Sequence, residues 1–69
     1  MKQQLIDGLI AKYNGDIGSA RANVIVYLTN PVGIGEHPDI IAAIDGELIK
    51  IAEAEDKLLA LDKHFSKDW

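Results

Sequence analysis

Three potential metal ligands, Glu36, His37 and Asp39, lie close together near the middle of the chain. Carboxylate and imidazole groups bind zinc and related metals, but a protein site needs a complete ligand set in a defined geometry. The sequence has no cysteine and no second cluster of such residues that would complete the site. We therefore predict no metal site, and we interpret Glu36 and His37 as a candidate contact at the tip of a turn.

Other residues that could support chemistry form weak patterns. Gly33-Ile34-Gly35 lacks the third glycine of a dinucleotide-binding loop and the Lys-Ser/Thr pair of a phosphate-binding loop. Glu55 and Asp62 could act as an acid and a base only within a cleft, and a slim helical chain is expected to offer no pocket. No Ser/His/Asp or Cys/His arrangement is recognisable. The sequence therefore predicts no catalytic residue, no cofactor and no enzymatic activity.

The segment from Asn30 to Asp39 is the part of the chain that fits a helix poorly. Pro31 disfavours helical geometry at the residue before it, and two glycines permit the backbone angles of a reversal. Pro38 suits the first position of a new helix, and Asp39 would place a carboxylate in its first turn. We therefore predict a turn between two helices, at about 2–29 and 38–67.

Apolar side chains of the first predicted helix fall within one arc when residues are spaced at about 100°. These are Leu5, Ile6, Leu9, Ile10, Tyr13, Ile17, Ala20, Val24, Tyr27 and Leu28. The Asn14-Gly15 pair is a strong turn signal, and a break there would give a three-helix bundle. Because the apolar arc continues across this pair without a change of phase, we favour a continuous helix.

The second predicted helix carries a repeat of seven residues. Ile44, Ile51, Leu58 and Phe65 recur at this interval, with Ile40, Ala54 and Leu61 at the complementary positions and Glu47 as the polar exception. This spacing is typical of a coiled-coil seam. A second apolar line runs beside the seam and consists of Ile41, Leu48, Ala52 and Leu59. A helix with two apolar lines can contact two neighbours.

The expected fold is all-α, a single antiparallel two-helix hairpin over residues 1–69. Symmetric folding about Ile34 would bring Arg21 near Glu47, and Lys12 near Glu55 and Asp56. Two helices cannot cover each other's wide apolar faces, so we expect a homo-oligomer, a dimer in preference, that forms a four-helix bundle. The expected self-association or partner interface is the second line, Ile41, Leu48, Ala52 and Leu59.

Composition limits the classes of partner. Seven basic and eleven acidic residues give a net charge of −4, which argues against direct binding of nucleic acid or anionic membranes. No apolar run approaches the roughly 20 residues of a membrane span, and the first residues do not resemble a signal peptide. The absence of cysteine fits a cytoplasmic protein, and a cytoplasmic location is our expectation.

Parts of the sequence resemble small uncharacterised proteins of marine contractile-tailed bacteriophages, including cyanophages. The resemblance is carried by the turn from Asn30 to Asp39, by the segment 51–58 (IAEAEDKL) and by the segment 20–24 (ARANV). It implies a phage origin and a bacterial host cytoplasm, and it transfers no functional residue. The predicted function is a non-enzymatic interaction module that self-associates and docks a phage or host protein. The alternative is an accessory regulator of phage nucleic-acid metabolism that acts through protein contacts.

Overall fold

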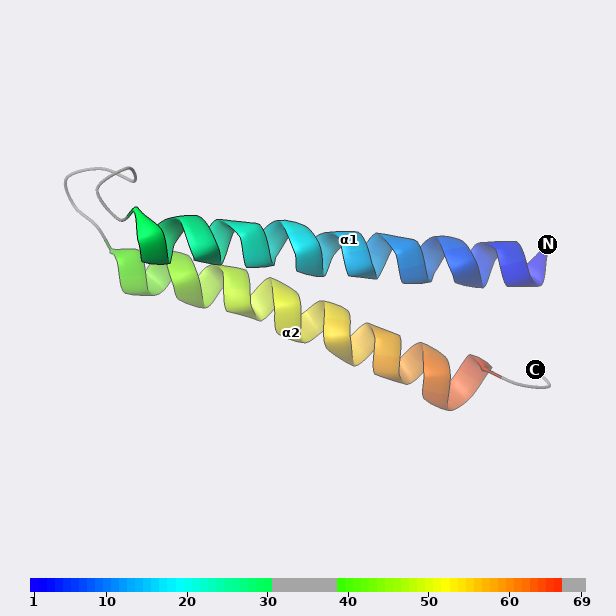
Figure 1. The fold of residues 1–69 in the computed structure, drawn as a ribbon. Helices are drawn as coiled ribbons and strands as arrows, with labels where there is room; N and C mark the ends of the chain where they lie inside the picture. The colour runs from blue at the N-terminus through cyan, green and yellow to red at the C-terminus, as the bar shows by residue number, and fades with distance from the viewer. Residues whose placement is uncertain (31–38, 67–69) are drawn as a thin grey trace.

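The computed structural model describes residues 1–30 and 39–66. Within these ranges every regular element is α-helical, and the two helices are α1 (Lys2–Thr29) and α2 (Ile40–Phe65). They run antiparallel along their length in a rod of 52 × 16 × 14 Å (Figure 1). The predicted all-α antiparallel hairpin is confirmed.

Helix α1 passes through Asn14-Gly15 without interruption, so the alternative of a three-helix chain broken there is wrong. Tyr13 and Ile17 lie on either side of the glycine, and both are half-buried against α2. Lys12 Nζ and Asp16 Oδ2 form an ion pair of 3.1 Å across the same turn of helix. Packing on one face and a short-range pair on another therefore offset the weak helix propensity of glycine.

The helix ends are defined by local hydrogen bonds. At the end of α1, the Thr29 hydroxyl donates to the Ile25 carbonyl at 2.7 Å. Helix α2 begins at Ile40, and the Asp39 carboxylate accepts a hydrogen bond from the Ala42 amide at 3.1 Å. Asp39 is thus the N-cap of α2. The sequence pattern had placed it within the first turn of the helix. Pro38 and the predicted last residue, 67, lie outside the described residues.

The seam between the helices repeats at alternating intervals of three and four residues. Its half-buried members include Ile6, Tyr13, Ile17, Val24 and Tyr27 of α1 and Ile40, Ile44, Ile51, Leu58 and Leu61 of α2. The predicted sides of both helices are therefore correct at these positions, but the predicted arc of α1 was too wide and the seam of α2 too long, since Leu5, Leu9, Ile10, Leu28 and Phe65 are exposed. Among the described residues only Ala20, Ala54 and Glu47 are fully buried, with 2%, 3% and 8% of their surface exposed. The hairpin therefore has a contact seam but hardly any enclosed core.

The axial register differs from the expected one. The Asn23 amide of α1 donates to the Glu47 carboxylate of α2 at 3.0 Å, where Arg21 had been expected. Lys57 lies over the ring of Tyr13, with its Nζ 5.5 Å from the ring centroid. In both pairs α1 contributes a residue two positions later than symmetric folding about Ile34 predicts, so the register is shifted by two residues. Lys12, which had been expected near Glu55 and Asp56, instead pairs with Asp16 on its own helix.

Candidate functional site

Glu47 is the buried polar residue of the seam. Asn23 Nδ2 donates to its Oε1 at 3.0 Å, and Lys50 Nζ donates to its Oε2 at 3.2 Å. The hydrogen bond from Asn23, followed by that from Lys50, lowers the pKa of the Glu47 carboxyl from its ordinary value, and burial opposes this only in part. Both carboxylate oxygens have partners, so Glu47 is suited to a structural role.

A polar groove flanks Glu47 on one side of the hairpin. Its volume is about 370 Å³, and its lining is Asp16, Ser19, Ala20, Asn23, Glu47, Lys50, Glu53, Ala54 and Lys57. Two lysines and three carboxylates face one small space, and several of them already pair with a protein neighbour. This mixture of both signs offers no clear complement for a ligand of one charge.

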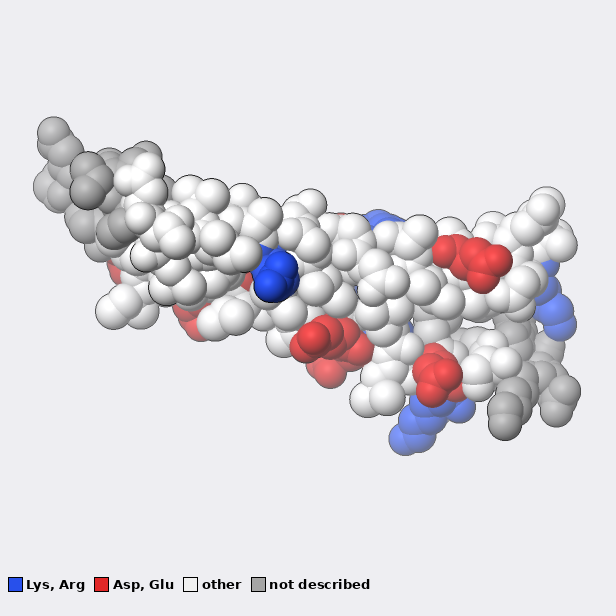
Figure 2. Space-filling model, in the orientation of Figure 1, with Lys and Arg blue, Asp and Glu red and all other residues white. Residues whose placement is uncertain are grey.

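The opposite side of the hairpin carries a row of exposed apolar side chains among a few charged ones, and we call it the docking face. Each residue of this face directly follows a residue of the seam in the heptad repeat. Its small and apolar members are Gly18, Ile25 and Leu28 of α1 and Ile41, Leu48, Ala52 and Leu59 of α2, and its charged members are Asp7, Arg21, Asp45, Glu55 and Asp62. Ile41 is 84% exposed and Leu59 is 64% exposed. Figure 2 shows this face, with a mostly uncharged surface that a few basic and acidic side chains interrupt over the halves of both helices that adjoin the turn. Apolar side chains in such a row are ordinarily covered by protein.

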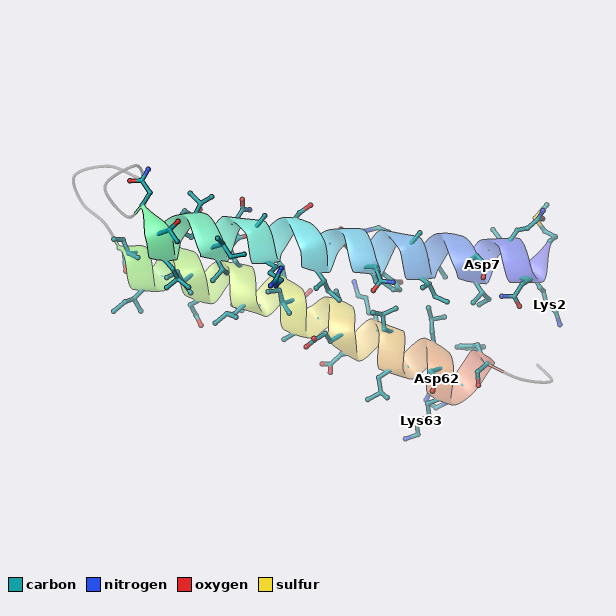
Figure 3. All side chains as sticks on the ribbon, in the orientation of Figure 1. Lys2, Asp7, Asp62 and Lys63 are labelled. Atoms are coloured by element: carbon teal, nitrogen blue, oxygen red, sulfur yellow. The ribbon has the colours of Figure 1, made fainter. Side chains whose placement is uncertain are left out.

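An apolar hollow lies on the docking face at the other end of the hairpin, where the two helices diverge toward the termini (Figure 1). Its volume is about 340 Å³, and it is lined by Gln3, Ile6, Ile10, Leu58, Leu61, Asp62, Phe65 and Ser66. Figure 3 places Asp7 of α1 and Asp62 of α2 at this open end. In Figure 2 the surface is recessed between their two carboxylates. The hollow therefore has aliphatic and aromatic walls, with Gln3, Asp62 and Ser66 as its polar lining.

The predicted interface residues share one side of α2. Ile41, Leu48, Ala52 and Leu59 are all exposed in the single chain. Residual apolar surface on the flank of the first helix was expected, but Leu28 had been assigned to the arc that faces the second helix, and Ile25 had not been singled out. Sequence reasoning also missed the open hollows, because it assumed straight and evenly packed helices and expected no pocket in a slim hairpin.

The other candidate sites gain no support. Glu36 and His37, the candidate turn-tip contact, lie outside the described residues, and so do Gly33 and Gly35. Residues 1–30 and 39–66 contain no group of three or more His, Cys, Asp or Glu side chains that could bind a metal ion. Glu55 and Asp62 both lie along the docking face, but only Asp62 lines the hollow at the open end, so the two carboxylates do not share a cleft. Neither described helix is long and apolar enough to cross a membrane.

No protein-family model, no curated protein and no solved structure matches the chain. The resemblance to phage proteins therefore stays a prediction, and the functional argument depends on the geometry of the hairpin.

Proposed function

We propose that this protein is a non-enzymatic helical-hairpin interaction module that self-associates through its docking face. The observation that supports the proposal is the contrast between a nearly absent core and a row of exposed aliphatic side chains on one side. Burial of apolar surface is the main favourable term in folding and association. A second copy would supply the surface that one hairpin lacks, and the product would be a four-helix bundle.

The accessible surface agrees in magnitude with this proposal. A compact monomer of this mass exposes about 4,250 Å² by general scaling, whereas the hairpin exposes 5311 Å². The hairpin therefore exposes about 1,000 Å² more than a compact monomer of its mass. Such an excess is expected of a chain whose apolar burial is completed by a second copy.

A phage or host protein is the second class of partner, and this part of the proposal depends on the resemblance of the sequence to phage proteins. Such a partner would use the surface that the dimer leaves free, including the turn near Glu36 and His37. The negative charge of the chain argues against nucleic acid in this role.

Two adjacent residues provide a matched test of self-association. Leu48 and Ile49 are 49% and 51% exposed, but Leu48 belongs to the docking face and Ile49 points away from both helices' seam. Leu48→Lys would replace an apolar contact with a charge that has to lose its hydration in the interface. We expect it to reduce the mass measured by light scattering from two chains to one at micromolar concentration.

Ile49→Lys is the control, because it makes the same change of charge and volume at an equally exposed site. We expect its mass to equal that of the parent. If the parent has the mass of one chain at every concentration, self-association is contradicted. Equal losses in the two variants would show that the docking face is not the interface.

A further inference from the structure

The two halves of the docking face differ in shape. Next to the turn, Ile25, Leu28, Ile41 and Leu48 are exposed by 44%, 67%, 84% and 49% and protrude from closely packed helices. At the open end the helices diverge around a hollow of about 340 Å³ with apolar walls. One half therefore presents apolar side chains, and the other half presents a space for them.

We propose that two hairpins pair face to face in opposite directions, so that the turn half of each copy fills the open-end hollow of the other. This inference rests on the proposed self-association and specifies its geometry. The pairing has a two-fold axis perpendicular to the helices, and each contact is made twice, as in other symmetric dimers. Helix α1 would lie on α1 of the partner, and α2 on α2.

Packing favours this direction over the alternative with both turns at the same end. With the turns together, the hollow of one copy would lie on the hollow of the other. The walls formed by Ile6, Leu58 and Phe65 would then enclose a space without partner atoms, and such cavities are costly. With the turns apart, Leu28 and Ile41 of the partner would fill that space.

Charge favours the same direction. The open half of the docking face carries Asp7, Glu55 and Asp62, whereas the turn half carries Arg21 and Asp45. With the turns together, the three carboxylates of one copy would face those of the other, and like charges at such a contact are unfavourable. With the turns apart, the acidic half of each copy would instead face the turn half of its partner, in which Arg21 offsets the charge of Asp45.

Small residues lie at the middle of the docking face, where the two-fold axis of the proposed dimer would pass. Gly18 of α1 and Ala52 of α2 lie across from each other near the middle of the hairpin, in the register set by Asn23 and Glu47. A Cβ atom built on Gly18 meets no atom within 4 Å, so the space in front of it is open. The two hairpins can therefore approach closely at their centre while the larger side chains interlock at either end.

Distances between spin labels test the direction of pairing. The chain has no cysteine, so Ala42→Cys and Lys63→Cys each provide one labelling site on the outer side of α2. The two sites are separated by about 30 Å along the helix. We expect the distance between two Ala42→Cys labels in the dimer to exceed the distance between Ala42→Cys on one copy and Lys63→Cys on the other.

The reverse order of distances, or equal distances, in a sample with the mass of two chains would overturn the opposite-direction pairing and leave self-association intact. The mass of one chain together with no interchain dipolar signal would instead overturn the proposed function. Ala22→Cys, near the middle of α1 on its outer side, serves as a reference because its interchain distance changes little with direction.

Discussion

At the level of single residues, Glu47 is the exception in an otherwise apolar seam. It occupies a seam position that elsewhere carries isoleucine, leucine or alanine, and it is hydrogen-bonded by Asn23 across the helix pair at 3.0 Å. A single polar residue at such a position favours one register, at a cost in stability, because other registers would leave it buried without a partner. We infer that Glu47 fixes the alignment of α1 on α2.

The lowered pKa of Glu47 predicts a specific dependence of stability on pH. A carboxyl group whose pKa is lower in the folded state stabilises the fold above its unfolded-state pKa. This contribution is lost as the pH falls through that value and through the lower folded-state pKa. We expect Glu47→Gln to be less stable than the parent at neutral pH and to approach it in acid, as measured by thermal unfolding between pH 7 and pH 2.

Glu53→Gln is the control for this prediction, since Glu53 lies on the same helix, carries the same charge and is exposed. We expect its stability to follow that of the parent across the pH range. An unchanged pH profile in Glu47→Gln would contradict the role assigned to the hydrogen bonds from Asn23 and Lys50.

At the level of the helices, the continuity of α1 through Asn14-Gly15 shows how tertiary contacts override a local turn signal. Gly15 lies on the outer side of α1, and a Cβ atom there would meet nothing within 4 Å.

Gly15→Ala should therefore stabilise the fold by about 1 kcal/mol, because alanine loses less backbone entropy and favours the helix. We expect the Tm to rise by about 4–8 °C, with an unchanged mass by light scattering. A lower Tm would indicate that the glycine is needed for a bend or for a contact with another chain.

Periodicity predicted which side of each helix faces the other, because phase depends only on the spacing of apolar residues. It did not predict the axial register, since sliding one helix by a heptad leaves the same sides in contact. The register depends on the exact path of the turn, and the assumed centre at Ile34 placed Arg21 where Asn23 lies. The start of α2 was missed for a related reason: Pro38 and Asp39 suit adjacent positions at a helix start, and only the Asp39–Ala42 hydrogen bond decides between them.

At the level of the whole molecule, the exposure of Ile41, Leu48 and Leu59 of α2 could be predicted because their heptad positions lie next to the seam, and their role as an interface stays a prediction. The open-end hollow was not predicted, since it arises from the divergence of two helices that the sequence pattern treats as parallel. The Asp7 and Asp62 positions face each other across this end in the heptad register, and two like charges there provide no attraction to close it. The single chain therefore has a hollow at its open end and exposed apolar side chains at its turn half, and the proposed pairing would bring the two together.

Folding and self-association should therefore be coupled. The single hairpin encloses only Ala20, Ala54 and Glu47 within its described residues, so most of its apolar burial would be completed by the partner. When a dimer unfolds to separate chains, its Tm depends on chain concentration. With an unfolding enthalpy of about 0.7 kcal/mol per residue over two chains, a tenfold increase in concentration should raise the Tm by about 5 °C. Circular dichroism from 1 to 100 µM would measure this shift.

The Leu48→Lys variant should show a lower Tm that does not change with concentration, because its unfolding would involve a single chain. A Tm of the parent that is constant across this range would mean that the hairpin reaches its stability without a second copy.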